Sequence, residues 1–277
     1  MNVIKNDFPK SKLIVVFPVV LFFIFSVWWA FLKTLHLDST NTINLIWGST
    51  YQILALYGGV AGLYIAQKWA GSKSLTGKII LAFSAGLLLQ VFGQSYSSYH
   101  VFHYRVDSLP YPAVGDIGFF GSVIAYIYGV MLLARVSGVK QRITSVKSKI
   151  LLFLIPLVFL VGSYGLFLRG YEFDWSKKIT ILLDFGYPLG QAFYVSIATL
   201  ALIMSRNILG GVMKKPILFL LIALLFQYVS DSYFLILAHS GMWHAGGLDD
   251  YLYCISYFIM ALAIISIGKA FETIKAS

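Results

Sequence analysis

Long runs of apolar residues, separated by short polar segments, make up most of the chain. A helix needs about 20 mostly apolar residues to cross a bilayer, and eight runs reach that length. The predicted spans are 13–33, 43–67, 79–100, 115–136, 150–168, 179–204, 216–238 and 250–268. These runs do not alternate as the strands of a membrane barrel do. The pattern therefore predicts an all-α polytopic membrane bundle of eight transmembrane helices, because a helix satisfies its own backbone in lipid.

The composition agrees with this fold class. Of the 277 residues 59% are apolar and only 12% are charged, with a mean hydropathy of +0.81, whereas a soluble domain has about 25% charged residues. No segment between the spans is long enough for a soluble domain, so residues 1–277 are predicted to form a single membrane domain. The one cysteine, Cys254, excludes an intrachain disulfide and a CxxC motif. The first apolar run is too long for a signal-peptide core, so we expect it to be retained.

The loops divide the charges unevenly between the two sides of the predicted bundle. Sixteen of the 21 Lys and Arg residues, with two acids, fall on the side of both chain ends, for a net charge of +14. The other half carries five cations and nine acids, for a net charge of −4. Short loops rich in Lys and Arg stay in the cytoplasm. We therefore expect a multi-pass protein of the cell inner membrane with both termini cytoplasmic, and anionic lipid rather than nucleic acid at the basic loops.

Residues of the first half recur in the second half. The matched pairs are Gln90 with Gln227, Gln94 with Asp231, Asp116 with Asp250, and Ser122 with Ser256. Because four spans return the chain to the same side, the sequence predicts two parallel four-helix repeats, 13–136 and 150–268. Transporters with parallel repeats often place their site between the halves. A duplication that only gives a stable bundle is the alternative.

Polar side chains inside the spans are few, and they gather in the outer half. Asp184 and Gln191 are seven residues apart, on one face of a helix that Pro188 can kink. Ionisable groups in a membrane are costly and usually face the bundle interior or water. We therefore expect an outward-facing polar cavity that binds a small ligand or ion. The expected ligand-binding residues are Asp184, Gln191, Asp231, Gln94, Gln52, Tyr187, Tyr233, Asp116 and Asp250. Hydrogen bonding between neighbouring helices is the alternative, which we favour for Gln52, Gln90 and Gln227.

Four short segments occur in an order that is typical of a known family. They are Leu109–Asp116 (LPYPAVGD), Asp184–Gly190 (DFGYPLG), Tyr228–Tyr233 (YVSDSY) and Leu248–Tyr257 (LDDYLYCISY). They resemble motifs of an eight-span sensor module at the N-terminus of membrane-bound diguanylate cyclases (GGDEF proteins) and some histidine kinases. The resemblance implies a membrane-embedded input domain. Gln191 stands where that family usually has a second acid, and the chain ends about ten residues after the last span. We therefore expect signalling to a separate cytoplasmic protein.

The sequence gives less support for a catalytic or metal-binding site than for this family. His100 and His103 lie at a predicted helix end near Asp116, but no HExxH motif occurs and no His or Lys lies at mid-membrane. No nucleophile–base pair is visible. We therefore expect no enzymatic activity and no cofactor or metal. A small-solute transporter or channel, and a structural subunit of a membrane complex, are the alternatives, and oligomeric state, including a homodimer, is left open.

Overall fold

A computed structural model describes residues 13–35, 41–104, 110–136, 146–205 and 213–276. Within these ranges the regular secondary structure is helical, which confirms the all-α prediction. Some of the cations that the charge argument assigns to the side of both chain ends lie outside the described residues. They are the Lys residues before position 13, Lys140, Arg142 and Arg206. Leu109 of the first motif also lies outside them.

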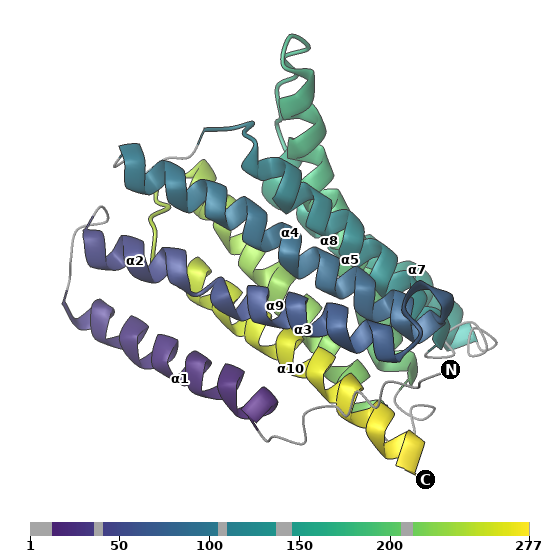
Figure 1. Cartoon of the computed structure of the whole chain (residues 1–277). Helices are drawn as coiled ribbons and strands as arrows, with labels where there is room; N and C mark the ends of the chain where they lie inside the picture. Colours follow the sequence, from purple (N-terminus) through teal and green to yellow (C-terminus); the bar gives the residue numbers. More distant parts are fainter. Residues whose placement is uncertain (1–12, 36–40, 105–109, 137–145, 206–212, 277) are drawn as a thin grey trace.

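Nine α-helices and two short helical turns follow one another along the described ranges (Figure 1). They are α1 (Leu13–Thr34), α2 (Thr42–Thr50), α3 (Ile53–Lys68), η1 (Gly71–Lys73), α4 (Leu75–Tyr104), α5 (Gly115–Val136), α7 (Val146–Ser163), η2 (Tyr164–Leu168), α8 (Lys178–Ser205), α9 (Lys214–His239) and α10 (Leu248–Ala276). Among the described residues seven helical segments are long and apolar enough to cross a membrane. The chain is thus a multi-pass integral membrane protein.

The predicted span 43–67 is divided into α2 and α3, of 9 and 16 residues. Around the division, two side chains donate hydrogen bonds to backbone carbonyls, in competition with backbone N–H groups. The Ser49 hydroxyl donates to Leu45 O at 2.7 Å, and Gln52 Nε2 donates to Ser49 O at 2.7 Å. Such local bonds often bend a helix. The structure therefore has seven continuous spans within the described ranges, where the sequence predicts eight.

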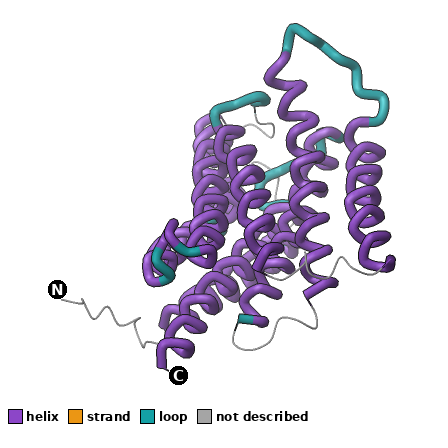
Figure 2. The backbone as a smooth tube through the Cα atoms, turned by 90° about the vertical axis from the view of Figure 1, so that its right-hand side faces the viewer, coloured by secondary structure: helices purple, strands orange, loops and turns teal. Residues whose placement is uncertain are grey.

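Six of the helices form a closed ring. Along the ring α3 contacts α4, α4 contacts α5, α5 contacts α8, α8 contacts α9, α9 contacts α10, and α10 contacts α3. Outside the ring, α1 packs against α10 and α7 packs against α8. Figure 1 shows α1 at one edge of the bundle. In Figure 2 the loop between η2 and α8 arches beyond the ends of the other helices.

Apolar side chains both fill the ring and cover its outside. Phe83 and Ile264 are fully buried inside it. By contrast, α1 and α7 expose large apolar side chains such as Phe23 and Phe153 along most of their length. Helices that are apolar all round fit a bundle surrounded by lipid.

Candidate functional site

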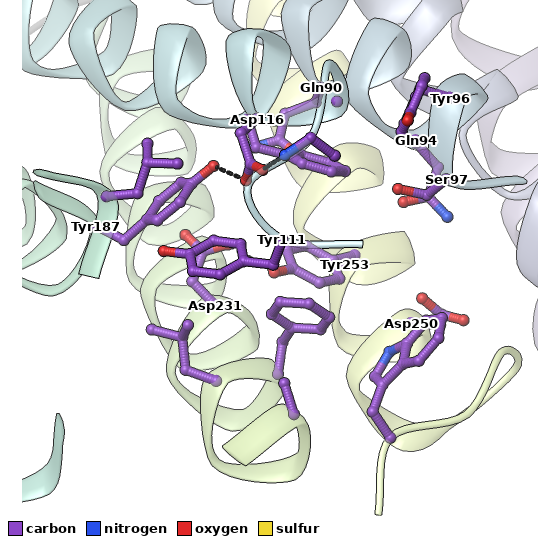
Figure 3. Close-up of a pocket in the computed structure, with 18 of the residues that line it drawn as sticks. Gln90, Gln94, Tyr96, Ser97, Tyr111, Asp116, Tyr187, Asp231, Asp250 and Tyr253 are labelled. Carbon is purple, nitrogen blue, oxygen red and sulfur yellow. Dashed lines mark hydrogen bonds between the residues drawn. The ribbon is translucent and has the colours of Figure 1, made fainter. Parts of the chain in front are cut away.

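A cavity of about 750 Å³ lies inside the ring at one end of the bundle (Figure 3). At this end α4 and α9 finish and α5, α8 and α10 begin, and we call it the cavity end. The opposite end carries most of the described cations, including Lys68, Lys73, Arg135, Lys147 and Lys214, and we call it the basic end. The cavity has the size of a small-molecule site, for which about 300–1,000 Å³ is typical.

Most of the residues that the sequence analysis selects do line this cavity. The lining includes Asp184, Gln191, Asp231, Gln94, Tyr187, Asp116 and Asp250. It does not include Gln52 or Tyr233. Gln52 instead accepts a hydrogen bond from the Ser95 hydroxyl of α4 at 3.1 Å, so it links two helices. Tyr233 lies on α9 outside the lining, partly exposed.

Asp231 is buried in the wall of the cavity and accepts hydrogen bonds from three helices. Its side chain is 7% exposed and accepts three hydrogen bonds. The Tyr253 hydroxyl donates to Oδ1 at 2.7 Å, Gln227 Nε2 donates to Oδ1 at 3.1 Å, and the Tyr194 hydroxyl donates to Oδ2 at 3.1 Å. Because a buried carboxylate without partners is costly, these donors from α8, α9 and α10 hold Asp231 at the cavity wall.

Asp184 is held by two tyrosines from the segments that border the mouth of the cavity. The Tyr111 hydroxyl donates to Oδ1 and the Tyr171 hydroxyl donates to Oδ2, both at 2.7 Å. The hydrogen bond to Asp184 raises the pKa of Tyr171 to about 12, because it stabilises the neutral phenol beside a carboxylate. Burial and the same carboxylate raise the pKa of Tyr111. Asp184 therefore ties two loop segments to α8.

Asp116 and Asp250 occupy corresponding positions in the first turns of α5 and α10. Asp116 Oδ2 accepts from a backbone N–H three residues earlier at 2.8 Å, and Asp250 Oδ2 accepts from one four residues earlier at 2.7 Å. Both are helix-start positions, where a carboxylate is favourable. The other oxygen of each accepts from a tyrosine, Tyr187 at 2.7 Å for Asp116 and Tyr51 at 2.9 Å for Asp250. Figure 3 shows Tyr187 pointing at Asp116.

Three polar residues of the lining, Gln90, Tyr253 and Tyr257, were not among the ligand-binding residues expected from the sequence. Tyr253 and Tyr257 both line the cavity, and the Tyr257 hydroxyl donates to Gln90 Oε1 at 3.0 Å. A signal for them exists in the sequence. Residues 250, 253 and 257 share one face of a helix, so the acid at position 250 indicates which tyrosines of α10 face the interior.

The charged groups of the lining all have the same sign. Four aspartates line the cavity, and no Lys, Arg or His belongs to the described lining. His100 and His103 lie on α4 outside it. Within the described ranges no group of three or more His, Cys, Asp or Glu side chains is arranged to hold a metal ion.

Comparison of the chain with known protein families, curated proteins and solved structures finds no match. The resemblance to the sensor module therefore rests on the sequence motifs. Each of the four motifs contributes one acid to the cavity lining, at Asp116, Asp184, Asp231 and Asp250.

Proposed function

We propose that this protein is a non-enzymatic membrane receptor of the sensor-module type. It binds a small ligand in the cavity and passes the signal to a separate cytoplasmic protein. The observation that carries the proposal is the cavity itself, in which four carboxylates from four helices of the ring converge. Ionisable groups placed in a membrane usually serve function. Towards the basic end the ring is filled by buried apolar side chains such as Phe83, Leu133 and Ile264.

We further propose eight crossings in two parallel repeats, with α2 and α3 together making the second crossing. Residues 42–68 would span about 40 Å as a helix, against a hydrocarbon core of about 30 Å. Contacts around the ring support the repeat, since α3–α4, α4–α5 and α5–α8 correspond to α8–α9, α9–α10 and α10–α3.

Two hydrogen bonds also recur in the repeat. Gln90 Nε2 donates to Ser122 Oγ at 2.7 Å, and in the second half the Ser256 hydroxyl donates to Gln227 Oε1 at 3.0 Å. Likewise a tyrosine of the second crossing bonds Asp250, and a tyrosine of the sixth bonds Asp116. The cavity then lies between the repeats, where ligand sites of repeat-built membrane proteins are often found.

In this proposal the basic end faces the cytoplasm and contacts anionic lipid, and the cavity faces outwards. The helix α10 connects the two, because it runs without a break from Asp250 at the cavity to Glu272 at the basic end. There Glu272 pairs with Lys68 of α3 at 3.2 Å. A ligand that binds one arrangement of the ring more tightly shifts the population towards it, and α10 carries that change to the cytoplasmic partner.

The test is a thermal-stability screen of the protein in lipid nanodiscs against cationic, neutral and anionic small molecules. A ligand at about 100 times its Kd adds about 2.7 kcal/mol of stability, so we expect at least one charge class to raise the Tm by several degrees. The same compounds should raise the Tm markedly less with Asp231→Asn or Asp184→Asn, by about half for a tenfold weaker Kd. Asp174→Asn is the matched control, because Asp174 lies at the same end on an exposed loop outside the cavity.

A second readout addresses signalling. An environment-sensitive fluorophore on Ser72→Cys, in a Cys254→Ala background, reports on the basic end, since Ser72 is exposed there. The stabilising compounds should change its emission. The proposal fails if no compound stabilises the wild type, or if the compounds stabilise both cavity variants as much as the wild type. Uptake of a stabilising compound into proteoliposomes would favour a transporter instead.

A further inference from the structure

We infer that the ligand of this cavity is an organic cation, an amine or ammonium compound with an apolar body. The inference rests on the proposed function and names the chemical class that the cavity would recognise. Three independent features of the lining point to it: the sign of its charges, the direction of its hydrogen bonds, and its aromatic walls.

The charges of the lining lack a counter-charge within it. Asp116, Asp184, Asp231 and Asp250 converge on one cavity at the end of a membrane bundle, without a Lys, Arg or His in the described lining. Lys33, on α1 and outside the described lining, interacts with Asp250 only through space, and its ammonium lies 5.3 Å from the centroid of the Trp29 ring. Buried charges in proteins are normally paired. A cation in the cavity would supply the pairing that the lining does not.

The carboxylates of the lining have hydrogen-bond acceptor capacity left. The tyrosine hydroxyls at the wall have one hydrogen each, and Tyr111, Tyr187 and Tyr253 donate theirs to Asp184, Asp116 and Asp231. An ionised carboxylate can accept about four hydrogen bonds, and the hydrogen bonds seen from described residues number three for Asp231 and two each for Asp116, Asp184 and Asp250. A ligand that donates hydrogen bonds therefore fits these carboxylates. Two lining groups that can donate, Ser98 Oγ and Trp243 Nε1, are also buried without a partner among the described residues, so an acceptor on the body of the ligand would fit as well.

Gln191 is the independent sign of a missing donor. Its side chain lines the cavity and is 3% exposed, yet its Oε1 atom accepts no hydrogen bond from any described residue. A buried acceptor without a partner is costly to maintain in the absence of a ligand. An N–H group of a bound amine would satisfy it.

The rest of the wall is apolar and rich in aromatic rings. The aromatic lining residues include Tyr96, Tyr111, Phe119, Phe167, Phe234 and Trp243. Aromatic faces attract cations, most strongly when the cation has left water, and they also bury an apolar body. A volume of about 750 Å³ exceeds what an inorganic ion needs, and the described residues form no metal-binding group. These features favour an organic cation over a metal ion.

The test uses sets of three compounds of equal size that differ in charge. One set is 2-phenylethylamine, 2-phenylethanol and phenylacetate, and further sets carry an indole or a linear alkyl body. Binding to the nanodisc-embedded protein is measured by calorimetry and by the shift in Tm. We expect the amine of at least one set to bind at least about tenfold more tightly than its neutral and anionic partners. Gln191→Leu and Asp184→Asn should each weaken that binding about tenfold, because the first removes an acceptor for the N–H group and the second removes a charge opposite the cation.

Asp174→Asn is the control, because it makes the same chemical change outside the cavity and should leave amine binding unchanged. If Asp184→Asn does not fold, Gln191→Leu tests a second contact in the same cavity without removing a charge. The inference is overturned if neutral or anionic members bind as tightly as the amines, or if the stabilising compounds of the wider screen are anions; in either case the proposed receptor function survives. If no compound of any charge binds, the receptor function falls as well.

Discussion

At the scale of single residues, the recurring unit of the site is an aspartate that accepts a hydrogen bond from a tyrosine hydroxyl. All four lining acids have such a partner, and the donor comes from a different helix or loop each time. A charge-assisted hydrogen bond of this kind is short and directional. It fixes the rotamer of the carboxylate and joins two elements, while leaving lone pairs for a ligand.

The contact between Tyr171 and Asp184 gives a prediction about alkaline titration. Because the bond raises the pKa of Tyr171 to about 12, this phenol should stay protonated when ordinary tyrosines ionise near pH 10. The bond stabilises the fold fully below pH 10, and the contribution is lost as the pH rises towards 12. The absorbance difference at 295 nm between the wild type and Tyr171→Phe should therefore show one group with its midpoint near 12. A midpoint near 10 would mean that the bond does not form.

The sequence predicts the acids of this unit but, apart from Tyr187, not its tyrosines. An Asp inside an apolar run is conspicuous because it is costly there, so Asp184 and Asp231 can be selected from the pattern alone. The chain has 18 tyrosines, and tyrosine is amphipathic enough to sit on any face of a membrane helix. Only the fold shows which of them, such as Tyr194 and Tyr253, reach an acid.

At the scale of the helices, a close approach between α4 and α5 shapes the cavity wall. Gly118 of α5 lies against the backbone of α4, where an added Cβ would meet Leu89 O at 2.5 Å and Gly93 N at 2.7 Å. Small residues let membrane helices pack closely in this way. The two helices bring Gln90 and Gln94 of α4 beside the start of α5.

Gly118→Ala should therefore destabilise the protein, because backbone atoms of α4 have to move. Overpacking of this type costs about 1–3 kcal/mol, so the Tm in detergent, followed by circular dichroism at 222 nm, should fall by several degrees. Gly162→Ala is the matched control. Gly162 lies on α7 with no atom within 4 Å of an added Cβ, and its Tm should stay the same or rise slightly. An equal loss in both variants would contradict the close packing of α4 and α5.

The element boundaries show what hydropathy can and cannot predict. The described ranges confirm the helical character of the eight predicted runs, with ends that differ by at most about four residues except at α10, which extends to Ala276, eight residues past the predicted end. The division between α2 and α3 was not predicted, because the run 43–67 is apolar throughout and the division depends on local side-chain bonds of Ser49 and Gln52. The hydropathy pattern predicts which residues form a helix. It does not predict where a side chain hydrogen-bonds a backbone carbonyl and interrupts that helix.

At the scale of the whole molecule, the ring places chemically different groups at its two ends. The four acids of the lining come from chain positions far apart, yet they meet because α5 and α10 begin, and α9 approaches its end, at the cavity end. The charge asymmetry of the sequence predicts this separation, because it follows from which loops carry Lys and Arg. The cavity volume was beyond sequence reasoning, since it depends on how six helices close into a ring.

The orientation of the two ends in the membrane is the last prediction, and single cysteines can test it. In a Cys254→Ala background, Ser97→Cys places a thiol in the lining of the cavity, and Ser72→Cys places one on the exposed basic end. Because the cations of the basic end favour the cytoplasm, a membrane-impermeant maleimide should label position 97 in intact cells and position 72 only after permeabilisation. The wild type is the control for background, since Cys254 is fully buried and should stay unlabelled. The reverse pattern would turn the cavity towards the cytoplasm, and labelling of position 97 from neither side would mean that the cavity is closed to reagents of this size.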